Sequence, residues 1–447
     1  MKDLFAALEL DPFFGVTGHG RFASRYCVSD LAVSSMGAVG CALADLIEAL
    51  GLAPARPDVT VDQRLASLWF RWSLYPDGWK LPPVWDAIAG DYRSTDGWVR
   101  LHTNAMRHRQ AACSALNVEA DRAAVADIVL RMPKSEVEDV VVSAGGAAAA
   151  MHSREEWLAH PQGRAVSGEP MVDWSAPRHV RAGAWRPTLA RPLAGLRVVD
   201  LTRVLAGPVA TRTLAGFGAE VLRIDPPDWD EPSVVPDVTP GKRCARLDLR
   251  KADGRDRFAA LLAEADVFVH GYRPGALDGL GLDEAWRRSA APNVLEASLC
   301  AYGWTGPWSR RRGFDSLVQM SSGIAASGMA WAGKDTPTPL PVQALDHATG
   351  YIMAAAIIRA LETRIRDRRI RDARLSLART AELLASSEQD IQDDAIDGVE
   401  GGDLDPAIER TPWGAARRLA SPLRVNGAIF GWDSPACELG SSPAQWG

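Results

Sequence analysis

Asp346 is the residue whose type and position best suit covalent chemistry. It stands near the start of ALDHATGYIMAAAIIRALET (344–363), a run of small and apolar residues typical of a buried helix. The helix dipole and unpaired backbone N–H groups stabilise a carboxylate at a helix N-terminus. An ionised carboxylate there can attack an acyl carbonyl. Because aspartate is also common as a helix cap, spacing alone favours a cap over a nucleophile.

Three segments that combine glycines with polar side chains could line one ligand site. They are TRVLAGP (202–208), GYRPGAL (271–277) and AYGWTGP (301–307), and each follows a short apolar run expected to be a buried strand. The carboxyl ends of parallel strands meet at one edge of a sheet, where ligands bind. The side chains of these segments are therefore candidate ligand contacts.

Several common catalytic signatures are absent from the sequence. There is no Walker A motif, HExxH or GxSxG, and the glycine pair at 216–218 precedes a strand and lacks the third glycine of a dinucleotide fingerprint. The eight histidines show no metal-ligand spacing, and we expect His102 and His108 to be surface or packing residues. We therefore expect no metal site, and dehydrogenase, kinase, metalloenzyme and serine hydrolase functions are disfavoured.

Composition is that of a globular protein with two or three domains, with 447 residues, 47% of them hydrophobic and 24% charged. The net charge of −6 gives no reason to expect nucleic acid as a partner. The apolar stretches at 31–50 and 348–361 are expected to be core helices, so no membrane partner is expected. Six scattered cysteines without a CxxC pair, and an N-terminus without signal-peptide features, favour a cytoplasmic location.

Short apolar runs alternate with amphipathic stretches from residue 193 onward. This alternation predicts an α/β fold with a Rossmann-like, doubly wound parallel sheet. The expected strands are 196–201, 220–225, 245–249, 266–272 and 293–303. The expected helices lie near 207–218, 253–265, 283–290 and 344–363.

The rest of the chain divides by composition. We expect an N-terminal helical segment at 1–83, a smaller α+β domain at 84–174, a Pro- and Arg-rich linker at 175–192 and the large domain at 193–447. Within the smaller domain, Ser153 and Glu156 have the spacing of a capping box. The acidic stretch at 386–410 is expected to be a surface loop.

The segment PLAGLRVVDLTRVLAGPVATRTLAGFGAEVLRID (192–225) resembles the opening of the family III CoA-transferases, the carnitine/formyl-CoA transferase group. The resemblance continues in order through KRCARLDL (242–249), DVFVHGYRPGALDGLGL (266–282), PNVLEASLCAYGWTGPWSRRRGFDSLVQMSSGIA (292–325) and ALDHATGYIMAAAIIRAL (344–361). VWDAIAGDYRSTDGWVRLHT (84–103) and SREEWLAHP (153–161) resemble the family's small domain, which in the family is inserted within the large one. We infer a rearranged order, with the helix at 30–50 as a partial repeat and Asp30 in the place of Asp346.

This resemblance implies an enzyme that moves CoA from an acyl-CoA donor to a carboxylic acid acceptor, a transferase of sulfur-containing groups. Asp346 would be its nucleophile, carrying CoA as an aspartyl thioester, and would also cap its helix. Coenzyme A would be substrate and product, with no tightly bound cofactor, and the protein would be a homodimer. By motif position the expected CoA contacts are Arg203, Val204 and Leu205 after the first strand, Lys242 and Arg243 in a phosphate-facing turn, Tyr272, Arg273, Gly275 and Leu280 on the adenine side, and Tyr302 near the reactive end.

Some positions depart from the family pattern. Gly271 and Cys300 stand where some members have asparagine and lysine, and Gly401–Gly402 is the candidate for the glycine-rich catalytic loop. The 2-methylacyl-CoA racemases of the same superfamily pair an aspartate with a histidine for proton transfer. Here Phe314 stands at the histidine position, and we expect His347 to point elsewhere. An acyl-CoA lyase or hydrolase, and a non-catalytic CoA-binding subunit, are further alternatives.

Overall fold

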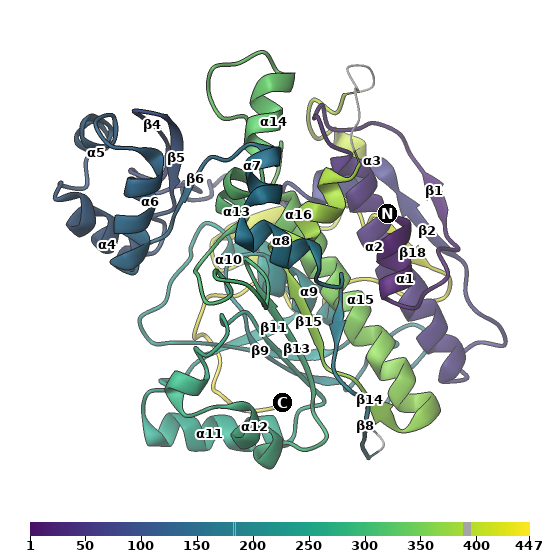
Figure 1. The fold of residues 1–447 in the computed structure, drawn as a ribbon. Coiled ribbons are helices and arrows are strands. Elements are labelled where there is room, and N and C mark those ends of the chain that lie inside the picture. The colour runs from purple at the N-terminus through teal and green to yellow at the C-terminus, as the bar shows by residue number, and fades with distance from the viewer. Residues whose placement is uncertain (182, 184, 388–394) are drawn as a thin grey trace.

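A mostly parallel, seven-stranded sheet organises the computed structural model, which describes residues 1–181, 183, 185–387 and 395–447 (Figure 1). From one edge to the other, the strands are β11 (Lys242–Arg246), β10 (Glu220–Asp225), β9 (Arg197–Leu201), β12 (Val267–His270), β13 (Leu295–Cys300), β15 (Ala373–Ser376) and β7 (Asp173–Trp174). Neighbouring strands pair in parallel, except that β7 is antiparallel to β15. The predicted α/β fold with a parallel sheet is confirmed.

The order of the strands reverses at β9. The chain runs from β9 outward to β10 and β11, and then returns to place β12 on the other side of β9. Such a switch point opens a crevice at the carboxyl ends of the two central strands, where ligands of α/β proteins bind. Because Leu201 pairs with His270, the loops that follow these two residues begin side by side.

Alternate residues of the central strands face two different cores. Val198 and Val269 belong to the core that contains α9 and α15, whereas Val199 and Phe268 belong to the core that contains α11 and α12. This alternation is the period of two expected of a strand covered on both faces. The helices of this region are α9 (Ala206–Gly216), α10 (Val235–Val238), α11 (Ala252–Ala263), α12 (Glu284–Ala290), α13 (Asp315–Ser321), α14 (Ile324–Trp331), α15 (Ala344–Asp367) and α16 (Leu377–Ala385), with the short 3₁₀ turn η1 (Asp278–Leu280).

Two long helices, α2 (Val28–Ala49) and α15, lie side by side in the core (Figure 1). A small residue also lets α15 approach α9 closely. A Cβ added to Gly350 of α15 would lie 2.4 Å from the carbonyl oxygen of Ala206 in α9. By length and composition α2 could cross a membrane, but 89% of its most apolar window is buried inside the protein. Both helices are core helices, as predicted.

Residues 90–150 form a separate small sheet with its own apolar core, seen at the left of Figure 1. Its elements are β4 (Gly90–Ser94), β5 (Gly97–Leu101), α4 (Met106–Leu116), α5 (Arg122–Val129), α6 (Lys134–Ser143) and β6 (Ala148–Ala150). Two short helices, α7 (Arg154–Ala159) and α8 (Pro161–Ser167), follow. Ser153 and Glu156 form the predicted capping box at the start of α7.

The N-terminal segment pairs with the C-terminal one through two small sheets. The first contains β1 (Gly15–Thr17), β2 (Val59–Asp62) and β18 (Leu423–Val425), and the second contains β16 (Glu409–Thr411), β17 (Gly414–Arg418) and β3 (Leu74–Pro76). The remaining elements are α1 (Lys2–Ala7), α3 (Gln63–Trp69), the paired strands β8 (Arg178–His179) and β14 (Arg369–Ile370), and the turn η2 (Gly401–Asp403). The two ends of the chain are thus parts of one packed body.

One strand lies elsewhere than expected. The pattern at 245–249 predicted a strand, but β11 spans Lys242–Arg246. Leu247 and Leu249 produced the strand-like pattern because they pack into the core with α11, while the pairing of β11 with β10 ends at Arg246 and the Leu247 N–H donates to the Asp225 carbonyl. In the expected linker, residues 182 and 184 lie outside the described residues, as do residues 388–394 of the expected surface loop.

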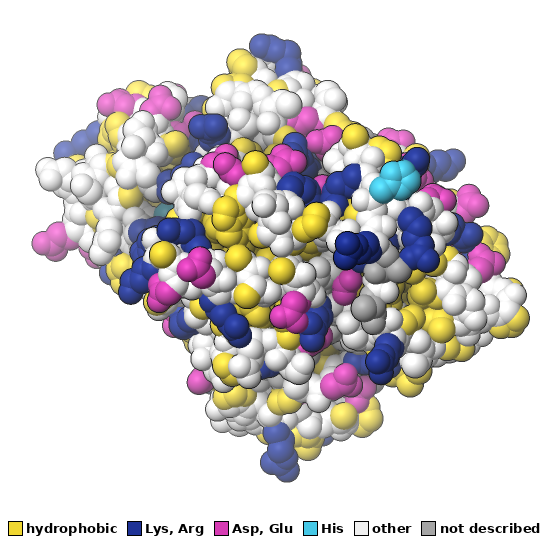
Figure 2. Space-filling model, turned by 90° about the horizontal axis from the view of Figure 1, so that it is seen from below, with side chains coloured by type: hydrophobic (Ala, Val, Ile, Leu, Met, Phe, Trp, Pro, Cys, Tyr) yellow, Lys and Arg dark blue, Asp and Glu magenta, His cyan; other side chains and the backbone are white. Residues whose placement is uncertain are grey.

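Charges of both signs are mixed on the surface. Figure 2 shows Lys and Arg side chains interspersed with Asp and Glu over the face viewed from below. Mixed charge of this kind produces no strong field of one sign over that face.

A buried ion network joins the N-terminal segment to the large sheet. Asp237 accepts hydrogen bonds from the Ser73 backbone N–H at 2.9 Å, the Ser73 hydroxyl at 2.6 Å and Arg212 at 2.7 Å. Arg418 of β17 lies 3.6 Å from the same carboxylate. Since Asp237 is 1% exposed, its charge is stabilised by these partners rather than by water.

Replacing Asp237 should therefore destabilise the whole fold. In Asp237→Ala the buried Arg212 loses its counter-charge, whereas Arg418 keeps its pair with Glu409, and the loss costs about 3–5 kcal/mol of unfolding free energy. Urea unfolding followed by circular dichroism measures this loss. Asp433→Ala is the matched control, because Asp433 also binds an arginine but is 88% exposed, and it should cost less than about 1 kcal/mol. Equal losses in the two variants would contradict the role of the network.

Candidate active site

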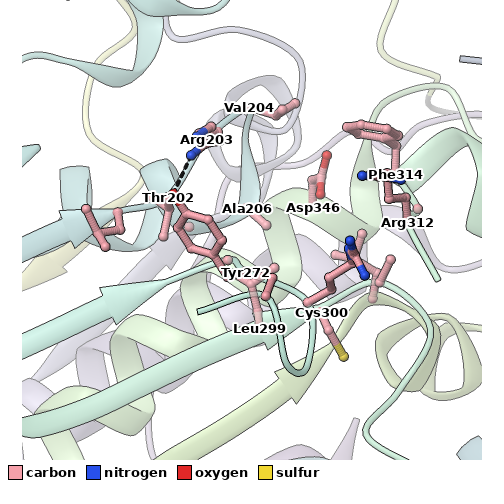
Figure 3. Close-up of a pocket in the computed structure, with 18 of the residues that line it drawn as sticks. Thr202, Arg203, Val204, Ala206, Tyr272, Leu299, Cys300, Arg312, Phe314 and Asp346 are labelled. Carbon is pink, nitrogen blue, oxygen red and sulfur yellow. Dashed lines mark hydrogen bonds between the residues drawn. The ribbon is translucent and has the colours of Figure 1, made fainter. Parts of the chain in front are cut away.

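A cavity of about 260 Å³ lies at the carboxyl ends of β9, β12 and β13 (Figure 3). Residues 202–204 reach it from β9, residues 271–273 from β12 and residues 299–301 from β13. The first residues of α9 and α15 close it on another side, and Arg107 and His108 of α4 line it from the small domain. The cavity thus occupies the crevice that the strand order creates.

Asp346 is the one carboxylate among the described residues that line this cavity. It is the third residue of α15, whose N-cap is Gln343, without a capping side chain. The capping role expected of Asp346 belongs instead to Asp315, which accepts the Asp346 backbone N–H at 2.9 Å. The Asp346 carboxylate is therefore not engaged by its own helix and faces the cavity, in the middle of the view in Figure 3.

The pKa values of Asp315 and Asp346 are both raised. Burial raises the pKa of Asp315 to about 6. Burial, together with the neighbouring Asp315 charge, holds the pKa of Asp346 well above its usual value. The protonated form of Asp346 is therefore more favoured than in a free aspartate, and a nearby cation would favour the ionised form.

Arg203 packs against two aromatic rings at the β9 side of the cavity. Its guanidinium carbon lies 4.8 Å from the ring centroid of Trp229 and 5.0 Å from that of Tyr272, and it donates a hydrogen bond to the Tyr272 hydroxyl at 2.5 Å. This bond is the dashed line in Figure 3. Stacking and hydrogen bonding fix the planar cation in one orientation, as anion recognition requires.

The loop between β9 and α9 holds a strained residue. Val204 has φ 65°, a left-handed conformation that β-branched residues rarely adopt. Its N–H donates to the Glu231 carboxylate at 2.9 Å, and Glu231 is in turn paired with the buried Arg223. Such strain persists only where the surroundings enforce it, and it concentrates at functional sites. The following helix, α9, begins with its N-terminus at the cavity.

Comparison with known proteins identifies the part of the chain that builds most of this cavity. Residues 193–409 match the family model described as CoA-transferase family III. This part of the chain belongs to CoA-transferase family III.

Curated relatives of the family III region carry transferase names. An acetyl-coenzyme A transferase of Hypoxylon pulicicidum is 36% identical over 203 residues, covering 44% of this chain and 33% of its own length. A probable fatty acyl-CoA transferase of Mycobacterium tuberculosis is 33% identical, covering 40% of this chain and 48% of its own length. A succinyl-CoA:glutarate CoA-transferase of Mus musculus is 35% identical, covering 39% and 43%. The chain thus spans a third to about half the length of these relatives. A crystal structure of a Mycobacterium tuberculosis protein aligns with TM-score 0.40 and 31% identity over 44% of this chain and 58% of that one.

The structure brings some of the expected family III contacts together. Of the residues predicted from the sequence, those that line the main cavity are Arg203, Val204, Tyr272, Arg273 and Asp346. Leu280 lines an adjoining cavity of about 180 Å³, which shares Arg203 and Tyr272 with the first. Leu205 is the buried N-cap residue of α9, and Gly275 turns the chain with φ 77° beside Arg310. Tyr302 is buried behind the cavity, where its hydroxyl lies 3.1 Å from Ser321.

Lys242 and Arg243 do not form the expected phosphate-facing turn, because they are the first residues of β11. The Lys242 side chain is fully buried, with its Nζ 3.1 Å from Asp200, and it also donates to the Thr211 hydroxyl at 2.6 Å. Arg243 lies 3.7 Å from Glu220. Lys242 therefore ties β11 to β9 and α9, and neither cation lines the two cavities.

Several residues that line the cavity were not predicted from the sequence. His108 was expected at the surface or in packing, but it is buried and lines the cavity together with Arg107 of the same helix. No local pattern marks these two residues, because the placement of α4 is tertiary. Arg311 and Arg312 belong to an arginine run that ends two residues before Phe314, and this run was an available signal.

Other expectations concern residues near the site. The His347 ring stacks on Phe70 with centroids 5.2 Å apart and does not line the cavity, so it points elsewhere as predicted. Phe314 lines the cavity at the position of the racemase histidine. Asp30 is paired with Arg21 at 2.6 Å at the start of α2. Gly401 and Gly402 are exposed in η2 and lie outside the described lining of the cavity.

Removing the Asp315 charge should change the pH dependence of stability. The folded protein binds a proton at Asp315 more tightly than the unfolded chain, in which aspartate titrates near about pH 4. The free energy of unfolding therefore falls as pH rises from about 4 through about 6. Asp315→Asn can still accept the Asp346 N–H but removes one acidic group, so the fall should shrink by about 1 kcal/mol or more.

Urea unfolding at several pH values between about 4.5 and about 7 measures this difference. The exposed Asp433→Asn serves as control and should follow the natural protein. An unchanged pH dependence in Asp315→Asn would show that the two carboxylates do not interact as described.

Proposed function

We propose that the chain is a CoA-transferase that moves CoA from an acyl-CoA donor to a carboxylic acid, with Asp346 as the nucleophile. The supporting observation is a single carboxylate, free of its own helix, in a cavity that is also lined by five arginines, Arg107, Arg203, Arg273, Arg311 and Arg312. The family of residues 193–409 and the names of the relatives support the same reaction class.

The first half of the reaction transfers CoA to the enzyme. The ionised Asp346 carboxylate attacks the thioester carbonyl of the donor, the carbon–sulfur bond breaks, and a mixed anhydride and CoA thiolate form. The thiolate then attacks the aspartyl carbonyl of the anhydride. This step releases the donor acid as its carboxylate and leaves CoA bound to Asp346 as a thioester.

The second half runs the same steps in reverse with another acid. The acceptor carboxylate attacks the aspartyl thioester, which again gives an anhydride and CoA thiolate. Attack of the thiolate on the acceptor carbonyl forms the new acyl-CoA and restores the Asp346 carboxylate. Each anhydride conserves the energy of the thioester, so no other energy source is needed.

The cavity contains groups suited to the charges of these steps. Ala206 and Gly207, the first two residues of α9, line it, and N–H groups in the first turn of a helix have no acceptor within that helix. They are the proposed donors to the oxyanion that forms at the attacked carbonyl. Arg203, Tyr272 and Leu280 of the adjoining cavity are the proposed contacts of the adenine and phosphate end of CoA.

Substituting Asp346 should abolish covalent capture of CoA. Incubation of the protein with acetyl-, succinyl- and glutaryl-CoA, followed by peptide mass spectrometry, should reveal an acyl- or CoA-sized adduct on the Asp346 peptide. Asp346→Asn should show none, because the amide is a poor nucleophile. Asp30→Asn is the matched control, since Asp30 occupies the equivalent place at the start of α2 but is paired with Arg21, and it should retain the adduct.

An adduct that persists in Asp346→Asn would place the nucleophile elsewhere. If the natural protein binds CoA but never forms an adduct or consumes an acyl-CoA, it is a non-catalytic CoA-binding subunit and not a transferase.

A second candidate function, proton exchange at the α-carbon of an acyl-CoA, is favoured by His108. Its Nδ1 is buried without a hydrogen-bond partner among the described residues, and the side chain lines the same cavity as Asp346. Burial and the nearby Arg107 and Arg312 lower the pKa of His108 to about 4, so the imidazole is neutral at neutral pH. An imidazole and a carboxyl group in one cavity are the two kinds of group that such an exchange uses.

His108→Gln tests this alternative. If the exchange occurs, 2-methylacyl-CoA should take up deuterium from D₂O at the α-carbon with the natural protein, and His108→Gln should lose about 99% or more of that rate. His102→Gln is the control, because His102 stacks on Phe314 behind the cavity lining. Absence of deuterium uptake in the natural protein would remove this candidate and leave the transferase.

A further inference from the structure

Two cysteines that lie far apart in the sequence meet at the edge of the large sheet. Cys244 is the third residue of β11 and is buried, whereas Cys437 belongs to the C-terminal segment and is partly exposed. Their side chains are in contact through a hydrogen bond between the two thiols. Neither residue belongs to the described lining of the two cavities at the candidate active site, so the proposed reaction does not use this pair.

The C-terminal segment, residues 434–447, runs along β11, which is an edge strand of the seven-stranded sheet. The Gly241 N–H donates to the Ser434 carbonyl at 3.0 Å, and the Ser442 N–H donates to the Cys244 carbonyl at 2.8 Å. Backbone hydrogen bonds therefore hold the segment against the strand before and after the point where the thiols meet. A disulfide needs its two backbones close together, and this arrangement already supplies that condition.

The surroundings of Cys437 favour its thiolate. The hydrogen bond from the Cys244 thiol lowers the pKa of Cys437 most, and burial opposes this effect. A hydrogen bond to Ser441 and the positive charges of Lys242 and Arg223 lower the pKa further, to about 7. The same contact with Cys437, together with burial, holds the pKa of Cys244 well above its ordinary value. Because the thiolate is the form that reacts with oxidants, Cys437 is the reactive member of the pair and Cys244 its protonated neighbour.

Cys27 and Cys113 provide a comparison within the same chain. Both are partly exposed, as Cys437 is. Burial raises the pKa of each of them. They are therefore mostly protonated near neutral pH, and we expect both to react more slowly than Cys437.

We propose that Cys437 and Cys244 form a peroxide-sensitive pair, which on oxidation joins the C-terminal segment to β11 through a disulfide. The Cys437 thiolate attacks one oxygen of hydrogen peroxide, the O–O bond breaks, and a sulfenic acid forms while the leaving hydroxide takes up a proton to become water. The Cys244 sulfur then attacks the sulfenic sulfur, the S–O bond breaks, and hydroxide leaves with the Cys244 proton as a second water. The two thiols supply the two electrons that reduce the peroxide, and a dithiol reductant reverses the change.

Peptide mass spectrometry of the full chain tests the cross-link directly. Trypsin releases Cys244 within residues 244–246 and Cys437 within residues 425–447. After treatment of the reduced protein with hydrogen peroxide near neutral pH and blocking of free thiols, these two peptides should appear linked, and dithiothreitol should separate them. Cys437 should also be modified about tenfold or more faster than Cys27 and Cys113. A sulfinic acid on Cys437 with Cys244 still reduced would overturn the proposal, as would equal reactivity of these three cysteines.

Single substitutions distinguish the two roles. In Cys244→Ser the sulfenic acid on Cys437 has no thiol to react with, so its capture by dimedone should rise about tenfold over the natural protein. In Cys437→Ser, Cys244 should stay reduced under the same treatment. Cys113→Ser is the matched control and should form the cross-link normally. Equal dimedone capture in Cys244→Ser and the natural protein would show that Cys244 does not complete the disulfide, and circular dichroism of each variant checks that the fold is retained.

Thermal unfolding tests whether the bond fastens the C-terminal segment. A disulfide between residues 244 and 437 closes a long loop and restricts the unfolded chain, so oxidation should raise the Tm of the natural protein by about 3 °C or more. The rise should disappear with dithiothreitol and be absent from Cys437→Ser treated in the same way. An unchanged Tm in a protein shown to carry the cross-link would mean that the bond does not fasten the segment, contrary to the proposal.

Discussion

The hydrogen bond from the Asp346 backbone N–H to the Asp315 carboxylate is the interaction on which the site depends. It begins α15 without using the Asp346 side chain, so the carboxylate is left to face the cavity. It also places a second buried acid beside the first, which raises the pKa of Asp346. After burial, which raises the pKa of Asp346 most, the contact with Asp315 thus affects both the position and the pKa of this carboxyl group.

Close helix packing brings the remaining parts of the site to that carboxylate. Gly350, one turn beyond Asp346, lies against the Ala206 carbonyl, and any larger residue would push α15 away from α9. Because the two helices meet there, the N-terminus of α9 and the start of α15 open onto the same cavity. The buried Lys242 holds β11 against β9 and α9, so the cation first associated with phosphate is needed for the scaffold instead.

Electrostatics give the cavity its chemical character. Five arginines and a single carboxyl group line it, so positive charge prevails and the cavity suits anions. Two of the cavity-lining groups, Arg107 and His108, come from α4 of the small domain. The small domain thus contributes to the chemistry of a cavity whose floor is built by the large sheet.

The sequence by itself determined the parallel α/β sheet and the buried helices α2 and α15, and it predicted Asp346 as the nucleophile. These features follow from local signals: alternating apolar runs, small residues at helical spacing, and an aspartate at a helix start within family motifs. The strand β11 begins three residues before its expected start, since the apolar Leu247 and Leu249 that suggested a strand pack into the core with α11. Only the tertiary structure decided that Asp315 caps α15, that Lys242 is buried, and that Arg107, His108 and Arg312 line the same cavity as Asp346. Those contacts join residues far apart in the chain, and their geometry depends on how domains and helices pack, which no local pattern encodes.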